Sequence, residues 1–164
     1  MTRRGRVQAQ VKLRKVSAGR RRAPSRALHT IDAALAAHPD EPDLLLLKAH
    51  LLDRLGEYQE ARRLYSRVMR RDAANVLAAM DMGHSYYYAG RPALALRWYD
   101  RALALLRAGH FSGVWRVEWE EVHWFRAWSL AELGRNTAAV VCCRQGLARA
   151  PRSHPLLDLL RRIR

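Results

Sequence analysis

The sequence predicts an all-α protein built from stacked helix-turn-helix hairpins. Three observations predict this fold: a regular period, apolar residues at helical spacing within each period, and a glycine near the middle of each period that interrupts the spacing. The period is about 34 residues, a length typical of two amphipathic helices joined by a tight turn. The pairs that define it are Gly56 and Gly90, Ala61 and Ala95, Tyr65 and Tyr99, and His50 and His84.

The first unit, residues 24–41, is an incomplete repeat. Its Ala27 lies one period before Ala61, and its Leu35 lies one period before Met69. Full repeats follow over residues 42–75 and 76–109. In the third repeat, residues 110–153, the spacing between equivalent residues becomes longer, which indicates an insertion near residues 108–119. The equivalent pairs are Gly90 and Gly134, Ala95 and Ala139, Tyr99 and Cys143, and Leu103 and Leu147.

The last element expected is a capping helix over residues 154–164. Ser153 and Pro155 are typical of a helix start, and the leucines that follow would cover the last hairpin. A hairpin of this size cannot bury its own apolar face, so about three repeats with end caps must stack. Residues 24–164 are therefore predicted to form one domain.

These units resemble the tetratricopeptide repeat family, whose repeats of about 34 residues have small, aromatic and glycine residues at fixed positions. The third repeat departs from the pattern, with Cys143 at an aromatic position and Arg126 at a normally apolar one. The resemblance covers about residues 24–153 and implies a right-handed superhelix. The matches are Ala49, Gly56, Tyr58, Ala61, Tyr65 and Val68 in the first full repeat, and Gly83, Tyr86, Gly90, Ala95, Tyr99, Ala102 and Leu103 in the second.

In that family, the first helix of each repeat lines a concave groove that binds peptides. Family members that clamp a terminal carboxylate use Lys, Asn and Arg at positions that here include Asp43 and Asp81, so no such clamp is expected. The alternative is that Tyr87 and Tyr88 pack on a neighbouring helix, or that the N-terminal segment fills the groove. The groove residues implied by the resemblance are Leu46, His50, Arg54, Leu77, Met80, His84, Tyr87, Tyr88, Trp124 and Trp128.

The insertion carries a second candidate interface. Trp115 and Trp119 are four residues apart and would share one face of a lengthened helix that starts near Gly113. Leu105 and Leu106 at the end of the preceding helix would cover them, or a partner or second copy of the chain would.

The net charge of +15 at pH 7 is concentrated at the N-terminus. Residues 1–26 hold ten basic and no acidic residues, which leaves a net charge of only +5 for residues 27–164. We expect residues 1–23 to form a flexible basic tail that can bind a polyanion such as nucleic acid. The candidate contacts are Arg3, Arg4, Arg6, Lys12, Arg14, Lys15, Arg20, Arg21, Arg22 and Arg26.

Composition argues against several other classes of protein. No run of 18 apolar residues suggests a membrane span, and no apolar segment follows the N-terminal arginines as a secretory signal requires. Cys142 and Cys143 are adjacent and are expected to be small buried residues rather than a disulfide or a reactive thiol. These features predict a cytoplasmic protein; a transit peptide is a third, weaker interpretation of the tail.

No catalytic, cofactor or metal motif is recognisable in the sequence. Glu120 and His123 have a metal-ligand spacing but lack the second such pair that these sites need. His50 and His84 would lie one repeat apart in the groove, where we expect polar contacts rather than a metal.

We therefore expect a non-enzymatic module that binds an apolar peptide or helix of another protein and serves as an adaptor, scaffold or chaperone. The alternative is a nucleic-acid-associated protein tethered by its basic tail, through contacts mostly to phosphates. The oligomeric state is left open.

Overall fold

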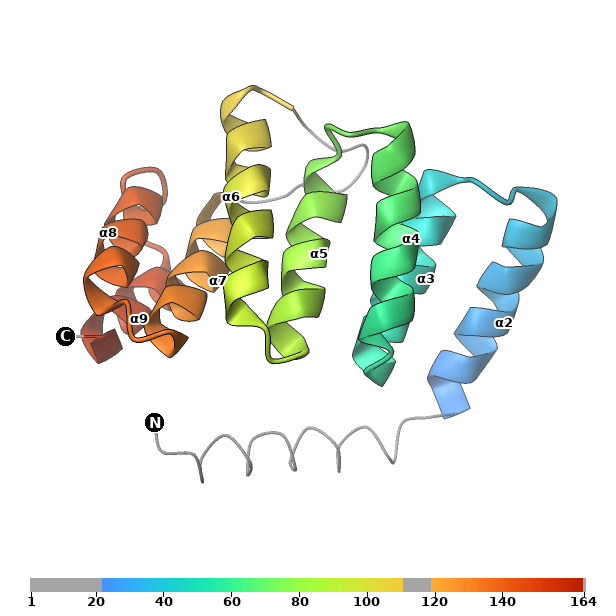
Figure 1. The fold of residues 1–164 in the computed structure, drawn as a ribbon, viewed down its shortest axis with the longest axis horizontal. Coiled ribbons are helices and arrows are strands. Elements are labelled where there is room, and N and C mark those ends of the chain that lie inside the picture. Colours follow the sequence, from blue (N-terminus) through green and yellow to red (C-terminus); the bar gives the residue numbers. More distant parts are fainter. Residues whose placement is uncertain (1–21, 111–118, 164) are drawn as a thin grey trace.

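The computed structural model describes residues 22–110 and 119–163, and all regular structure in these two ranges is α-helical (Figure 1). The all-α prediction is confirmed. The helices are α2 (Arg22–Ala37), α3 (Pro42–Leu55), α4 (Tyr58–Arg71), α5 (Val76–Tyr88), α6 (Pro92–Arg107), α7 (Trp119–Glu132), α8 (Asn136–Leu147) and α9 (His154–Ile163).

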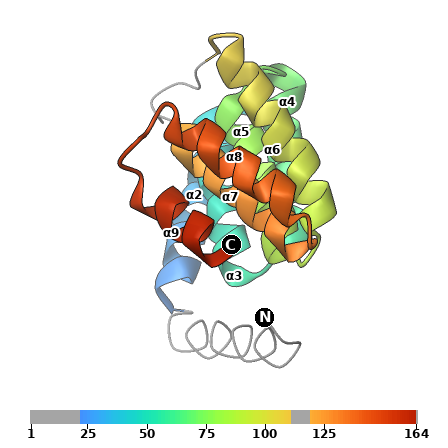
Figure 2. The same ribbon diagram turned by 90° about the vertical axis from the view of Figure 1, so that its left-hand side faces the viewer.

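The helices form a row that runs from α2 at one end to α8 and α9 at the other (Figure 1), and the hairpins stand behind one another when viewed along the row (Figure 2). Helices that follow each other in the chain pack as neighbours. The first helices of successive hairpins also touch, α3 with α5 and α5 with α7. We call the face made by α3, α5 and α7 the inner face, and the face made by α4, α6 and α8 the outer face.

A glycine in the left-handed conformation ends the first helix of each full hairpin. The φ angles of Gly56, Gly90 and Gly134 are 86°, 75° and 73°. Glycine adopts this left-handed region without steric strain because it has no Cβ atom. In all three turns, the amide after the glycine donates a hydrogen bond of 2.9 Å to the carbonyl five residues earlier. These bonds are Glu57 to Leu52, Arg91 to Tyr86, and Arg135 to Leu130.

Buried tyrosines fill the first two full hairpins. Tyr65 of α4 and Tyr99 of α6 are both 0% exposed. Helix α5 carries Gly83 opposite Tyr99, and a Cβ atom there would lie 2.5 Å from Cε1 of the ring. The two helices of this hairpin can approach so closely because Gly83 has no side chain.

Helix α9 covers the end of the stack, so the predicted capping helix is confirmed. Its Leu156 is fully buried and packs in one cluster with Cys142 and Cys143, which are also fully buried, as the sequence predicted. Gly146 of α8 makes room for the cap, because a Cβ atom there would lie 2.6 Å from Cδ1 of Leu156.

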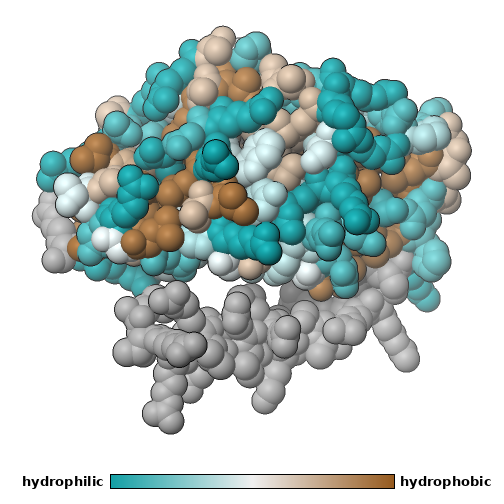
Figure 3. Space-filling view, in the orientation of Figure 1, coloured by the Kyte–Doolittle hydropathy of each residue, from teal (hydrophilic) through white to brown (hydrophobic). Residues whose placement is uncertain are grey.

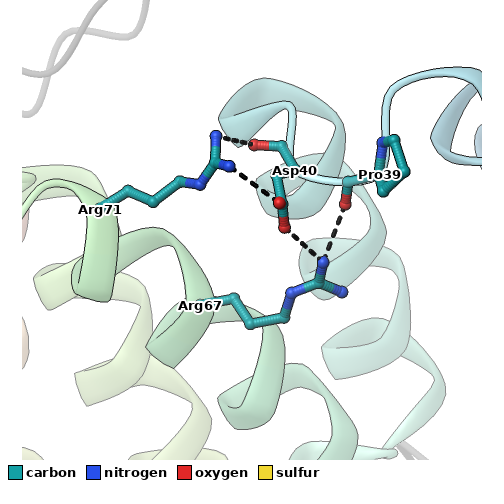
Figure 4. A network of polar contacts seen from close by, with 4 residues as sticks. All are labelled: Pro39, Asp40, Arg67 and Arg71. Carbon is teal, nitrogen blue, oxygen red and sulfur yellow. Dashed lines mark hydrogen bonds and ion pairs between the residues drawn. The ribbon is translucent and has the colours of Figure 1, made fainter.

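A polar network ties the turn after α2 to α4 (Figure 4). Nη2 of Arg67 donates to Oδ1 of Asp40 at 2.6 Å and to the carbonyl of Pro39 at 2.9 Å, and Nη2 of Arg71 donates to Oδ2 of Asp40 at 2.8 Å. The hydrogen bond from Arg67, together with the charge of Arg71, lowers the pKa of Asp40. The incomplete first repeat is thereby held in register with the hairpin that follows.

No helix in the described ranges has the length and apolar character needed to cross a bilayer.

We predict that replacing Gly83 by alanine destabilises the protein by about 1–3 kcal/mol, because the new methyl group meets the Tyr99 ring. This loss should outweigh the helix propensity of alanine, which favours it over glycine by ~1 kcal/mol. Denaturant unfolding measures the change, and the same substitution should cost less in a Tyr99→Leu background, where the ring is absent. A Gly83→Ala variant as stable as the wild type would contradict this packing.

Candidate functional site

The inner face divides the predicted groove residues into a buried and an accessible group. Leu46, Leu77 and Met80 are 4%, 7% and 5% exposed and belong to the main apolar core. This differs from the expectation that they line a groove. The reason is that the first helices of neighbouring repeats contact one another, so these side chains fill the space between them.

The three consecutive tyrosines of α5 point in different directions. Tyr86 lies against α4, where the guanidinium of Arg62 stacks 4.6 Å from the centre of its ring. The hydroxyl of Tyr87 donates to Oε1 of Glu132 on α7 at 3.1 Å. Tyr88 is 49% exposed. Successive helical residues are ~100° apart, which is why the three side chains leave the helix in different directions.

Phe125 of α7 is the centre of the rings on the inner face. Its ring centroid is 4.0 Å from that of His84 and 4.7 Å from that of Trp124. It also lies within 6.4 Å of the rings of Tyr87, Tyr88 and Tyr99. Each such pair contributes about 0.5–1.5 kcal/mol beyond its burial. We call the set His84, Tyr87, Tyr88, Trp124, Phe125 and Trp128 the aromatic cluster.

Polar contacts fix the end of the aromatic cluster near the cap. Nε1 of Trp128 donates to Oε1 of Glu132 at 3.2 Å, the same oxygen that accepts from Tyr87. The guanidinium of Arg162 on α9 lies 5.0 Å from the centre of the Trp128 ring, within the range of a cation–π contact. One carboxylate thus orients rings from two helices, and the capping helix covers part of the Trp128 ring.

A buried carboxylate joins the predicted histidines of two repeats. Oδ2 of Asp81 lies 2.5 Å from Nε2 of His50 on α3, and its Oδ1 lies 3.5 Å from Nδ1 of His84 on α5. The side chain of Asp81 is only 4% exposed, whereas that of His50 is 42% exposed. Asp81 therefore anchors both histidines, and His50 is the member that reaches solvent.

The charges of this group depend on one another. Burial alone would lower the pKa of His50, but the hydrogen bond that its ring donates to Asp81 and the charge of Asp81 outweigh burial and raise the pKa above the ordinary value of 6.5. Burial would raise the pKa of Asp81, and the two histidines lower it instead. The pair is thus a carboxylate with an imidazolium in weakly acidic solution.

Asp53 of α3 is a second half-buried carboxyl beside this pair. Its Oδ2 accepts a hydrogen bond of 2.9 Å from the hydroxyl of Tyr65, while its Oδ1 has no partner among the described residues. Burial raises the pKa of Asp53 to about 6, with a further contribution from the charge of Asp81. The inner wall near α3 is therefore polar, and the wall between α5 and α7 is aromatic.

The remaining groove candidate, Arg54, is exposed in the last turn of α3. Within residues 22–110 and 119–163, no group of three or more His, Cys, Asp or Glu side chains is arranged to hold a metal ion. His123, which the sequence paired with Glu120, is buried, and burial with the charge of Arg126 lowers its pKa to about 4. Its Nδ1 lies 3.5 Å from Sγ of Cys142.

Trp119 of the second candidate interface is half-buried at the start of α7. Arg149 stacks 4.0 Å above its ring, and His123 lies 6.0 Å away on the same helix. Trp119 also packs against the core cluster that contains Leu106, and Leu105 packs against the same cluster. Much of its surface is thus covered by the chain itself. Trp115 lies outside the described residues.

Most of the basic tail also lies outside the described residues. Of the ten candidate contacts, only Arg22 and Arg26 fall within the described ranges, both in α2. The polyanion contacts proposed for Arg3 to Arg21 therefore stay predictions.

Two residues that contact rings of the inner face were missed by sequence reasoning. Phe125 occupies the position in the third repeat that Asp81 holds in the second, once the insertion is allowed for. The longer spacing of the third repeat could have identified the equivalence, but α7 is apolar on several sides and the pattern does not single out one ring. Arg162 reaches the cluster from the capping helix, and no repeat position identifies it.

The geometry above is that of a helical-repeat protein in which hairpins stack around a shared inner face. The family model described as tetratricopeptide repeat matches residues 20–80. Tetratricopeptide repeat protein 8 of Caenorhabditis elegans is 38% identical over 82 residues, which are 50% of this chain and 16% of that protein. Residues 20–80 are thus similar to the tetratricopeptide repeat family, and the match with this relative covers only a small part of that protein's length.

Solved structures share this fold. The crystal structure of MamA superposes with a TM-score of 0.68 at 14% identity, over 82% of this chain and 72% of that chain. The first tetratricopeptide repeat domain of Spaghetti (RPAP3), bound to an HSP90 peptide, superposes with a TM-score of 0.64 at 20% identity, over 74% of this chain and 89% of that one. At these identities, the likeness concerns the fold.

We predict that Asp81→Asn lowers the pKa of His50, because the hydrogen bond and charge that raise it are weakened while burial remains. A raised folded-state pKa stabilises the protein below the unfolded value near 6.5, and this gain is lost as the pH rises through the folded value. The variant should therefore lose more stability at pH 6 than at pH 9. The difference between the two losses should be only about 1–2 kcal/mol, because solvent screens the partly exposed His50.

Nuclear magnetic resonance titration of the His50 ring protons measures the pKa, and denaturation at the two pH values measures the stability. Asp43→Asn serves as the control, because Asp43 is an exposed acid on α3, the helix that carries His50. An unchanged His50 pKa in Asp81→Asn would show that the contact does not control this imidazole.

Proposed function

We propose that the chain is a protein-interaction module that holds an apolar segment of a partner protein on its inner face. The observation that carries the proposal is the exposure of Tyr88, which is 49% accessible although its ring packs 5.4 Å from Tyr87. Tyrosine and tryptophan are enriched where proteins bind one another, because they offer a large contact area at a small cost in conformational entropy.

The surface around Tyr88 is held in place before any partner arrives. Tyr87 and Trp128 share the carboxylate of Glu132, and Phe125 packs under the rings of His84 and Trp124. Preorganised side chains lose little freedom on binding, so more of the contact energy appears as affinity.

The chemistry of this face favours a partner segment with an apolar or aromatic side chain and a nearby hydrogen-bond acceptor. Burial raises the pKa of Tyr88, which keeps its hydroxyl a neutral donor. His50, 42% exposed at the α3 end, adds a polar contact. An adaptor, a scaffold or a chaperone would each use a surface of this kind.

The comparisons support this proposal at the level of the fold. The similar domain of Spaghetti is bound to a peptide of HSP90. A binding role also accords with the sequence, in which no catalytic motif is recognisable.

The basic tail favours a second candidate function. Ten positive charges without an acid in residues 1–26 would bind nucleic acid or another polyanion mainly through phosphates, and salt should weaken such binding strongly. Contacts of the aromatic cluster should resist salt, so the two candidates can be separated in one experiment.

We predict that Tyr88→Ala loses at least one salt-resistant protein partner, with binding weakened about tenfold or more, as for a central interface tyrosine. Tagged wild type and variant are incubated with lysate of the native host at low and at high salt, and the retained proteins are quantified. Binding of the purified partner is then measured directly.

The control is Val141→Ala on α8, because Val141 is 48% exposed and lies outside the aromatic cluster. Melting curves should show little change in either variant. Equal retention of every high-salt partner by wild type and Tyr88→Ala would refute the inner-face proposal. Partners lost only at high salt would instead support contacts of the basic tail.

A further inference from the structure

A cleft of about 290 Å³ lies on the outer face, between α6 and α8. Its floor is apolar: Leu96 comes from α6, Leu130 from α7, and Leu133 from the turn after α7. Leu133 is 40% exposed. Figure 3 shows hydrophobic surface framed by hydrophilic surface in the part of the molecule where α6, α7 and α8 lie. This volume is near the lower end of ligand pockets, about 300–1,000 Å³, and suits a side chain or two.

The rim of the cleft is positively charged. Arg97, Arg126 and Arg135 line it together with one acid, Asp100. Nε of Arg126 donates to Oδ1 of Asp100 at 2.6 Å, and a guanidinium has four further N–H donors. In the ranges 22–110 and 119–163, Arg97 and Arg135 have no ion pair. The rim of the cleft therefore carries a net charge of +2, from three arginines and one aspartate, and its floor consists of leucine side chains.

The groove one repeat earlier explains why this cleft is open. There, Arg62 of α4 lies across the ring of Tyr86 at 4.6 Å and donates to Oγ of Ser85 at 3.2 Å, so the chain's own side chains fill the space. In the next repeat, Leu96 takes the position of Arg62 and Leu130 takes the position of Tyr86. Both leucines are shorter than the residues they replace, so the space stays unfilled.

A third exchange supplies the charge. Arg126 occupies the position that Met82 holds in the second repeat, where the methionine is 2% exposed in the core. Arg126 departs from the family pattern, which has an apolar residue at this position, and the inner-face function does not use it. Together, these exchanges turn a filled groove into a basic cleft with an apolar floor.

We propose that this cleft binds an acidic side chain of a partner protein together with an adjacent apolar side chain. Arginine pairs with carboxylates through two parallel hydrogen bonds, and Arg97 and Arg135 are free to provide them. The leucine floor takes the neighbouring apolar residue. The basic tail cannot be the occupant, because residues 1–26 contain no acid and would be repelled.

This inference does not rest on the inner-face function, because the cleft opens between α6 and α8 and shares no residue with the aromatic cluster. A variant can therefore lose binding at the cleft and keep binding at the inner face, or lose binding at the inner face and keep it at the cleft. The two proposals can thus fail separately.

The test uses the full chain labelled with ¹⁵N and a blocked peptide of alternating leucine and glutamate. We expect the peptide to shift the Nε–H signal of Arg126 and the backbone amide signals of Leu133 and Arg135. A dissociation constant on the order of 1 mM is expected for so small a contact. The same peptide with glutamine in place of glutamate should bind at least about tenfold more weakly.

Three variants locate the binding. Arg97→Gln removes an exposed charge, and Arg126→Met installs the residue of the preceding repeat; each should weaken binding at least about tenfold. Leu96→Arg with Leu130→Tyr rebuilds the filled groove and should abolish binding. Arg63→Gln, at the exposed equivalent of Arg97 on α4, is the matched control and should bind normally. Melting curves confirm that each variant is folded.

Several outcomes would overturn the proposal. Equal binding of the glutamine peptide would mean that charge is not recognised, and unchanged binding by Arg97→Gln would place the peptide elsewhere. If inorganic phosphate at the same concentration produces the same shifts and displaces the peptide, the cleft is a general anion site. If the shifts appear when the protein alone is concentrated, the occupant is a second copy of the chain.

Discussion

The whole stack depends on the turn between the two helices of each hairpin. Glycine at positions 56, 90 and 134 adopts φ angles of 86°, 75° and 73°, and the same 2.9 Å hydrogen bond closes each turn. A side chain at these positions would strain the backbone and change the angle at which the second helix returns. Because the three turns are alike, the three hairpins present equivalent residues to equivalent neighbours, and two apolar clusters follow one another along the stack.

Equivalent positions then acquire different roles through a few exchanges. Asp81 in the second repeat anchors two histidines, and its counterpart Phe125 in the third gathers the rings of the inner face. On the outer face, Arg62 closes one groove while its counterpart Leu96 leaves the next one open. A regular backbone with irregular side chains gives the two layers of helices different chemistry, which is how one repeat architecture can offer more than one binding surface.

The sequence predicted the backbone far better than the surface. The period and the glycines are local signals from which the hairpins followed, and the capping helix followed from Ser153, Pro155 and the leucines after them. Whether an inner-face residue is accessible depends on how closely the next helix packs, which periodicity within one helix does not encode. For this reason Met80 was expected in a groove and lies in the core, and the pairing of His50 with Asp81, which belong to different repeats, was not foreseen.

The most direct test of the stack is the contact between Phe125 of α7 and His84 of α5, which belong to different repeats. The chain has only two phenylalanines, so a Phe111→Leu variant leaves Phe125 as the single such ring. With ring centroids 4.0 Å apart, strong nuclear Overhauser effects between the Phe125 and His84 ring protons are expected. A folded variant that shows no such signals would contradict the packing of these repeats and the aromatic cluster built on it.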